Sequence, residues 1–148
     1  MTKNKKNKGF TLFERLVSIS IIGILTALAS VAFSGAQKKA RDARRVEDMK
    51  LVQVAAEQYY SQSNYVYPTN TSSASWIPTG GQAVLNSFPV DPKNDATYFY
   101  NYTPADVNTT YCACARVENT NNGNSNDRVC NFVASGPTAS YFCVKNQQ

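Results

Sequence analysis

The chain of 148 residues contains no histidine. Histidine is the most common general base near neutral pH and the most common metal ligand, so its absence removes the usual centre of many catalytic sites. The sequence also has no glycine-rich phosphate-binding loop, and its serines have no base partner that would activate them. The sequence therefore predicts a protein that is not an enzyme, with no catalytic residues, no cofactor and no metal.

Positive charge is scarce in the second half of the chain. The formal net charge is +5 at pH 7, but four lysines precede Gly9 and a second basic run covers residues 38–50. After Lys50, four cationic residues stand against six acidic ones. A basic nucleic-acid-binding surface is therefore not expected there, and DNA is a partner that the charge of this part does not support.

Cysteine is absent from the first 111 residues, and four cysteines follow: Cys112, Cys114, Cys130 and Cys143. An even, clustered set in an exported chain predicts two disulfides and an oxidising compartment. Cys112 and Cys114 point to the same face of a strand and do not usefully pair with each other. Two pairings remain, with a slight preference for 114–130. A four-thiolate zinc site is the alternative, although the paired C-x-x-C spacing is missing.

Charge is also absent from the 22 residues between Arg15 and Lys38. As a helix, this segment is ~33 Å long, which matches the ~30 Å hydrocarbon core of a bilayer. The sequence predicts a transmembrane helix with its core at residues 16–33 and its amino terminus in the cytoplasm. A core helix of a soluble protein is one alternative. A cleavable secretory signal is another, but its apolar part is shorter and has no acidic residue at its start.

Glu14 stands at the edge of this segment, where a carboxylate that sits deep costs ~2.5–3.5 kcal/mol. If the chain is cut after Gly9, the new α-amine of Phe10 lies four residues before Glu14. The amine of a neighbouring subunit, shifted along the helix axis, would neutralise the Glu14 carboxylate and fix the stagger between subunits. The alternatives are an ion pair with Arg15 and a carboxylate that extends to the membrane interface.

The stretch "KGFTLFERLVSISIIGILTALA" resembles the amino terminus of type IV pilins and pseudopilins. The resemblance implies that a prepilin peptidase removes residues 1–9 by cutting between Gly9 and Phe10, and that the Phe10 amine is then N-methylated. It implies that Glu14 neutralises the amine of an adjacent subunit during assembly, and that residues 10–34 form the filament core.

Two features depart from the pattern of that family. Its members usually carry an apolar residue at the position of Arg15, and many major pilins have a proline near Val31. Here Arg15 adds a charge that competes for Glu14. Without the proline, only Gly23 and Gly35 favour a bend in the helix.

Helical spacing continues beyond the apolar segment. Apolar residues follow at intervals of three and four, namely Val46, Met49, Val52, Ala56 and Tyr59, and no proline occurs before Pro68. The pattern predicts one helix over residues 11–62, the second half of which packs on a globular head. The basic run 38–45 is interpreted as a solvated helix face, with contact to acidic lipid head groups or DNA as alternatives.

The remainder, residues 63–148, reads as a disulfide-linked head. A turn-rich loop (63–81), in which Trp76 is expected to pack inside, precedes four short segments with strand character near residues 98–102, 109–118, 128–135 and 140–145. These four segments predict an antiparallel meander. The expected fold class is therefore α+β, with a long helix packed on a small sheet, as in the pilin fold. A calcium site from Asp91, Asp95 or Asp106 is an alternative that no ligand spacing demands.

These features together predict a structural subunit of a type IV pilus-like surface filament. The partners would be the prepilin peptidase, further copies of the chain, the inner-membrane assembly machinery and the membrane itself. The precursor would cross the inner membrane once before it joins an extracellular filament. The alternatives are a pseudopilin of a type II secretion or DNA-uptake system, and a membrane-anchored binding domain that does not polymerise.

Overall fold

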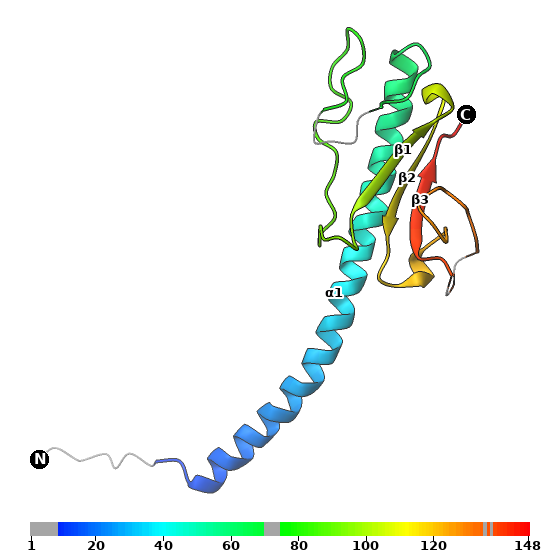
Figure 1. Ribbon diagram of the computed structural model, residues 1–148. Helices are drawn as coiled ribbons and strands as arrows, with labels where there is room; N and C mark the ends of the chain where they lie inside the picture. Colours follow the sequence, from blue (N-terminus) through cyan, green and yellow to red (C-terminus); the bar gives the residue numbers. More distant parts are fainter. Residues whose placement is uncertain (1–8, 70–74, 135, 137) are drawn as a thin grey trace, which may run out of the picture. The chain divides into compact units, whose positions relative to one another are not determined.

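The computed structural model of the chain describes residues 9–69, 75–134, 136 and 138–148. Along the chain its elements are α1 (Leu12–Gln62), β1 (Tyr100–Ala105), η1 (Asp106–Asn108), β2 (Thr110–Arg116), η2 (Thr120–Asn122) and β3 (Tyr141–Lys145) (Figure 1). This order confirms the predicted α+β class, a long helix followed by a small antiparallel sheet. The predicted leader peptide, apart from Gly9, lies outside the described residues.

The chain divides into two compact units, residues 1–37 and 38–148. The helix α1 contributes its first half to one unit and its second half to the other. The second unit is the head, which contains the whole sheet.

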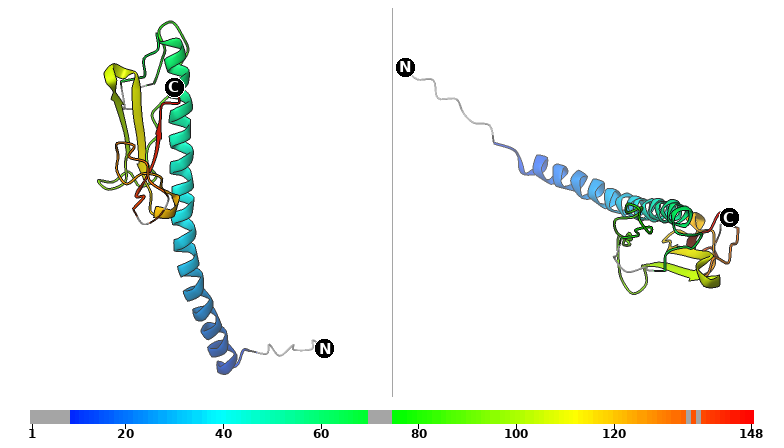
Figure 2. Two further views of the ribbon diagram at one scale, coloured as in Figure 1. Left: turned by 90° about the vertical axis from the view of Figure 1, so that its right-hand side faces the viewer. Right: turned by 90° about the horizontal axis from the view of Figure 1, so that it is seen from above.

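In the head, one sheet lies along residues 38–62 of α1 (Figures 1 and 2). Its strand order is β1-β2-β3, and both pairs are antiparallel. Tyr102 faces Ala113 across the first pair, and Cys114 faces Cys143 across the second. The central strand β2 therefore carries a pair of core alanines and the two closely spaced cysteines.

The core lies between the helix and the sheet, as the apolar stripe of the sequence predicts. Met49, Val52 and Ala56 of α1 are fully buried. Trp76 packs inside as expected, with its ring centroid 5.2 Å from that of Tyr102 and 5.8 Å from that of Phe88. Burying a side chain of this size contributes roughly 1.5–3 kcal/mol, so these contacts attach the long connection before β1 to the head.

The expected strand at residues 128–135 is wrong. Among the described residues, this stretch makes only an isolated bridge between Ser125 and Phe132, and β3 pairs directly with β2. The Asp127 carboxylate accepts hydrogen bonds from the Val129 amide (3.0 Å) and the Asn131 amide (3.3 Å), which turns the chain. Cys130 has a φ of 58°, a value incompatible with an extended strand. The segment is a loop, and the expected four-strand meander reduces to three strands.

Gly123 and Asn124, which precede this loop, lie in close contact with the chain at the start of β3. A Cβ atom at Gly123 would lie 1.9 Å from the carbonyl oxygen of Ala139, so no larger residue fits there. The close approach lets the Asn124 amide donate to the carbonyl of Tyr141 over 2.8 Å. Residues 124 and 125 thereby extend the hydrogen bonding of the sheet at its β3 edge.

Candidate functional site

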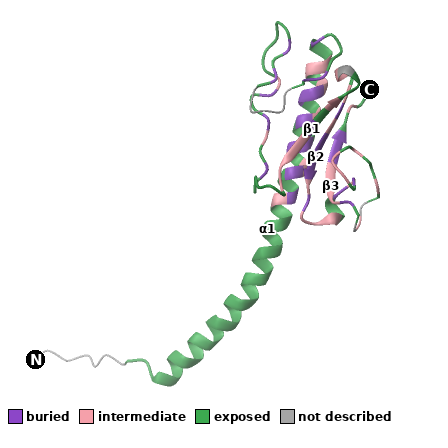
Figure 3. Ribbon diagram, in the orientation of Figure 1, coloured by how far each residue is buried: buried purple, intermediate pink, exposed green. Residues whose placement is uncertain are grey.

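The amino-terminal half of α1 exposes its apolar side chains on every side (Figure 3). The large apolar residues between Phe10 and Phe33 are exposed by amounts from 38% at Val17 to 84% at Leu12. A helix that is apolar all round is stable only where lipid or other protein surrounds it. The unit therefore needs partners or a bilayer to cover it.

The hydroxyl groups of this segment are satisfied within the helix. Ser18, Ser20 and Ser30 each donate to the carbonyl oxygen four residues earlier over 2.8 Å. No hydroxyl of these three needs water, which suits an apolar surrounding. Among the described residues, α1 is the one helix whose length and apolar content suffice to cross a membrane.

Glu14 and Thr11 close the start of the helix. The Glu14 carboxylate accepts hydrogen bonds from the Thr11 amide and the Thr11 hydroxyl, each 2.8 Å long. The Glu14 amide in turn lies 3.3 Å from the Thr11 hydroxyl oxygen. This reciprocal arrangement is a capping box, with Thr11 at the N-cap and Glu14 three residues later. The T-x-x-E spacing at residues 11–14 is the sequence signal for this role, which the sequence analysis above does not include.

The predicted alternative of an ion pair between Glu14 and Arg15 does not form. In the parts of the chain that the structure describes, neither residue takes part in any ion pair. Phe10, Glu14, Arg15 and Ser18 line one shallow recess on this end of the helix. The start of α1 therefore presents one carboxylate and one guanidinium that have no ion-pair partner in the described part of the chain.

Residues 4–30 match the family described as the prokaryotic N-terminal methylation motif. The amino terminus of the chain thus carries this methylation motif. The matched residues include the Gly9–Phe10 bond, the capping box and most of the exposed apolar segment.

Curated proteins similar to the chain include both kinds of subunit. The type IV major pilin protein PilA of Myxococcus xanthus is 31% identical over 61 residues, which cover 41% of this chain and 28% of PilA. The type II secretion system core protein G of Escherichia coli is 36% identical over 69 residues, 47% of each chain, and its counterpart in Vibrio cholerae gives the same values. The chain thus spans less than half the length of these relatives. No solved structure matches it.

The interpretation of the basic run 38–45 as a solvated face holds for Lys38, Lys39 and Arg44 but is wrong for Arg41 and Arg45, which are used inside the head. Arg41 forms an ion pair of 2.6 Å with Glu118, and Arg44 one of 3.1 Å with Asp48. Arg45 is fully buried. Only the two lysines at the start of the run remain exposed with no ion pair among the described residues, so little of this charge is left for lipid or DNA.

Arg45 is the centre of a buried ion-pair cluster, which we define as Arg41, Asp42, Arg45, Asp91 and Glu118. Its guanidinium contacts both carboxylate oxygens of Asp91, at 2.7 and 3.0 Å. It also donates to Asp42 over 2.9 Å and to Glu118 over 3.0 Å. Burial opposes the charged form, but these hydrogen bonds outweigh it and raise the pKa of Arg45. The cluster ties α1 to the loop before β1 and to the turn after β2.

The Glu118 carboxylate is held in its charged form by this cluster. Hydrogen bonds from Arg41, and then from Arg45, lower its pKa from 4.5 to about 2 in spite of its burial. The folded head therefore prefers ionised Glu118 more strongly than the unfolded chain does. Each pKa unit corresponds to about 1.4 kcal/mol, so this preference amounts to about 3 kcal/mol.

The free energy of unfolding of the head is expected to fall in acid as Glu118 becomes protonated. Because the folded pKa is depressed, the contribution is complete above pH 4.5 and is lost as the pH falls towards 2. Unfolding by urea, followed at several pH values by the fluorescence of the single tryptophan, measures this loss. The variant Glu118→Gln should be less stable at neutral pH and less sensitive to pH in that window. If the free energy of unfolding changed equally with pH in the natural chain and in Glu118→Gln, the role assigned to Glu118 would be contradicted.

The three aspartates of the alternative calcium site do not come together. Asp91 is bound by Arg45 and by the Lys93 amide (2.8 Å). Asp95 accepts hydrogen bonds from the amides two and three residues later, and Asp106 accepts from the Thr110 hydroxyl. Within the described residues, the four cysteines are the one set of three or more residues with potential metal-ligand atoms in reach of one another. A calcium site at these aspartates is therefore not supported.

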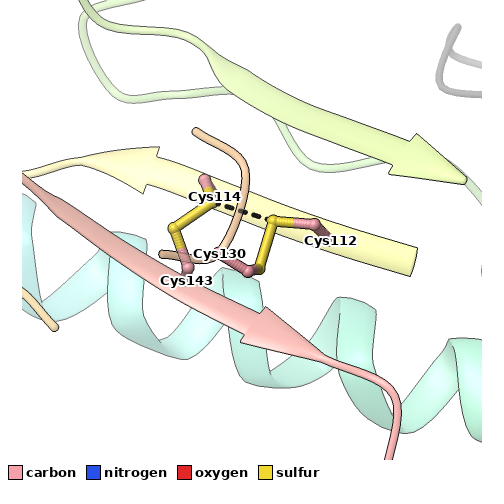
Figure 4. A group of neighbouring side chains, drawn as sticks. All are labelled: Cys112, Cys114, Cys130 and Cys143. Atoms are coloured by element: carbon pink, nitrogen blue, oxygen red, sulfur yellow. Dashed lines mark hydrogen bonds between the residues drawn. A yellow bond between two sulfur atoms is a disulfide. The ribbon is translucent and has the colours of Figure 1, made fainter. Parts of the chain in front are cut away.

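The four cysteines form two disulfides, Cys112–Cys130 and Cys114–Cys143 (Figure 4). Cys114 and Cys143 are opposite each other on β2 and β3, and Cys130 reaches Cys112 from the loop. This result confirms that Cys112 and Cys114 do not pair, and it overturns the slight preference for 114–130. That preference assumed a hairpin between residues 109–118 and 128–135, which does not exist.

Proposed function

We propose that the chain is a structural subunit of a type IV pilus-like surface filament and that it is not an enzyme. In this proposal, a prepilin peptidase cuts between Gly9 and Phe10, the Phe10 amine is N-methylated, and the mature subunit assembles through residues 16–33. Glu14 sets the register by neutralising the amine of a neighbouring copy.

The observation that carries this proposal is the combination at the start of α1. An exposed apolar helix carries in its first turn a carboxylate that has no ion-pair partner among the described residues and lies four residues after Phe10, the first residue after the proposed cut. In a plain membrane anchor this carboxylate would serve only the helix cap with Thr11, whereas a staggered polymer also supplies it with an amine that balances its charge. The matched methylation motif supports the same mature amino terminus.

The second candidate is a pseudopilin of a secretion or DNA-uptake system. The similarity to the type II secretion system core protein G favours it. A pseudopilin would use the same processing and the same helix. The two candidates therefore differ in whether the filament extends beyond the cell surface. The two disulfides and the polar head favour the surface filament, which is exposed to proteases and tension.

The proposal places the precursor in the inner membrane and the mature subunit in an extracellular filament. Further copies of the chain, the peptidase and the inner-membrane assembly machinery are the expected partners. DNA remains without support from the charge of the chain after Lys50, where six acidic residues stand against four basic ones.

The first test is the intact mass and amino-terminal sequence of the protein sheared from the cell surface. We expect a chain that begins at Phe10, heavier by one methylene group and lighter by the four hydrogens of two disulfides. The variant Gly9→Val, changed at the bond itself, should stay uncut and in the membrane. A natural chain cut near Ala36 would instead show a secretory signal, and an uncut natural chain would show an anchored domain.

A further inference from the structure

The two disulfides of the head are in contact with each other. All four sulfur atoms lie within 4.8 Å of one another. The Cys112 sulfur lies 3.4 Å from the Cys114 sulfur, although the two belong to different disulfides (Figure 4). The alternation of side chains along β2 puts both on one face, and the loop and β3 bring the other two sulfurs to that face.

The two disulfides differ in their access to solvent. Cys114 and Cys143 are buried, with 0% and 1% exposure. Cys112 and Cys130 are half-buried and border a groove of about 360 Å³ that opens between β2, β3 and the loop. A small thiol therefore reaches the Cys112–Cys130 disulfide but not the Cys114–Cys143 disulfide.

The charge around the groove favours a thiolate. Its described lining includes Lys145 and no carboxylate. A cation close to a thiol stabilises the thiolate, which is the form that attacks a disulfide. The groove is thus suited to start thiol exchange at Cys112–Cys130.

We propose that the Cys112–Cys130 disulfide is a thiol-exchange site through which a dithiol reduces the buried Cys114–Cys143 disulfide. The reacting partner is a dithiol, as a small molecule or at the exposed active site of an oxidoreductase. The inference is independent of the filament proposal, because it concerns only contacts within the head.

The exchange proceeds in three steps. A thiolate of the dithiol attacks the Cys130 sulfur, which forms a mixed disulfide and releases the Cys112 thiolate. The Cys112 thiolate attacks the Cys114 sulfur, 3.4 Å away in the oxidised head, and Cys143 leaves as a thiolate. The second thiol of the dithiol then displaces Cys130 and closes the oxidised dithiol. Two electrons pass to the protein, which gains thiols at Cys130 and Cys143 and keeps one disulfide, Cys112–Cys114, between two cysteines that are not paired in the oxidised head.

Trypsin provides a direct readout of this product. Cys112 and Cys114 lie on the peptide of residues 94–116, and Cys130 and Cys143 lie on the peptide of residues 129–145. In the oxidised protein both disulfides join these two peptides. After the proposed exchange the peptides separate, because the first holds an internal disulfide and the second holds both free thiols.

The experiment treats the full chain in detergent with limiting dithiothreitol, blocks free thiols with N-ethylmaleimide, and analyses the tryptic peptides by mass spectrometry. At the stage of one reduced disulfide, we expect peptide 94–116 lighter by two hydrogens and unlabelled, and peptide 129–145 with two labels. Joined peptides labelled at Cys112 and Cys130 would overturn the proposal. Joined peptides labelled at Cys114 and Cys130 would overturn the assigned attack at Cys114, and a head whose disulfides resist reduction would overturn the access argument.

Two paired variants serve as controls. In Cys112→Ser/Cys130→Ser, the remaining buried disulfide should be reduced at least 10-fold more slowly than in the natural chain. An equal rate would overturn the relay. In Cys114→Ser/Cys143→Ser, the labels should appear on Cys112 and Cys130, which checks that the exposed disulfide reacts first. The mapping on the natural chain needs neither variant, so the test holds even if a variant folds poorly.

Discussion

Replacing Arg45 by methionine is expected to lower the free energy of unfolding of the head by about 3–5 kcal/mol. Methionine fills much of the same space, so the loss comes mainly from charge. The change leaves the Asp91 carboxylate, which is 3% exposed, without its two guanidinium hydrogen bonds. Asp42 loses its hydrogen bond from Arg45 as well. Both carboxylates then remain buried with fewer hydrogen bonds and without the positive charge of Arg45.

The measurement is the urea midpoint of the full chain in detergent, followed by the fluorescence of Trp76. This residue is a suitable probe because it is the single tryptophan and is buried in the head core. The variant Arg45→Lys is expected to recover only part of the stability, since an ammonium does not reproduce the two-point contact with Asp91. The matched control is Arg44→Met on the same helix, whose side chain is 60% exposed. A smaller loss is expected there, because the buried Asp48 carboxylate keeps its hydrogen bond from the Tyr100 hydroxyl.

A similar midpoint for Arg45→Met and Arg44→Met would contradict the role assigned to the cluster. It would mean that the carboxylates of Asp42 and Asp91 find water or other donors once Arg45 is gone. Because the Asp42 carboxylate also accepts from the Glu118 and Asn119 amides, both at 2.9 Å, a partial recovery would be traced first to Asp42. The double variant Asp91→Asn/Arg45→Met separates the two carboxylates.

The sequence allowed the helix and its two environments to be predicted, because both follow from local patterns. The absence of charge over 22 residues indicates the exposed apolar half, and the spacing of Met49, Val52 and Ala56 indicates the buried face of the second half. The ion-pair cluster was missed because arginine and aspartate are normally solvated on a helix. The signal was nevertheless present: Asp42 and Arg45 continue the stripe of Met49 and Val52 at intervals of three and four.

The loop around Cys130 was not predictable in the same way. Residues 128–135 contain two valines and a phenylalanine, as a strand would, and no local signal shows that β3 takes the place beside β2. The outcome depends on contacts far apart in the chain, namely the disulfide to Cys112 and the close approach of Gly123 to Ala139. Strand propensity yields to such contacts, and the turn at Asp127 ends the extended backbone locally.

The capping box gives Glu14 two roles that substitutions can separate. Glutamine at the same position still accepts hydrogen bonds from Thr11 and keeps the helix start, but it carries no charge. Alanine removes both the cap and the charge. The variant Thr11→Ala removes the hydroxyl of the cap and leaves the carboxylate in place, so it is the matched control for the structural role.

If Glu14 neutralises the amine of a neighbouring subunit, Glu14→Gln and Glu14→Ala should both lose surface filaments. An uncompensated charge at this depth costs ~2.5–3.5 kcal/mol, and each 1.4 kcal/mol is about tenfold in an equilibrium. We therefore expect roughly 100-fold less protein in the shear fraction, with the membrane-bound chain still beginning at Phe10. Thr11→Ala should lose about fivefold or less, since a cap is worth about 1 kcal/mol.

The opposite order would identify the cap as the important feature. Wild-type amounts of filament from Glu14→Gln, together with a strong loss from Thr11→Ala, would mean that the helix start and not the charge limits assembly. Arg15 then becomes the charge to examine, because it lies in the same exposed end of α1 and has no ion pair among the described residues. Where Glu14→Gln instead loses filaments, the variant Glu14→Gln/Arg15→Leu tests whether Arg15 is the cause. If it restores filaments lost in Glu14→Gln, the uncompensated charge at the interface belongs to Arg15 and not to the neighbouring amine.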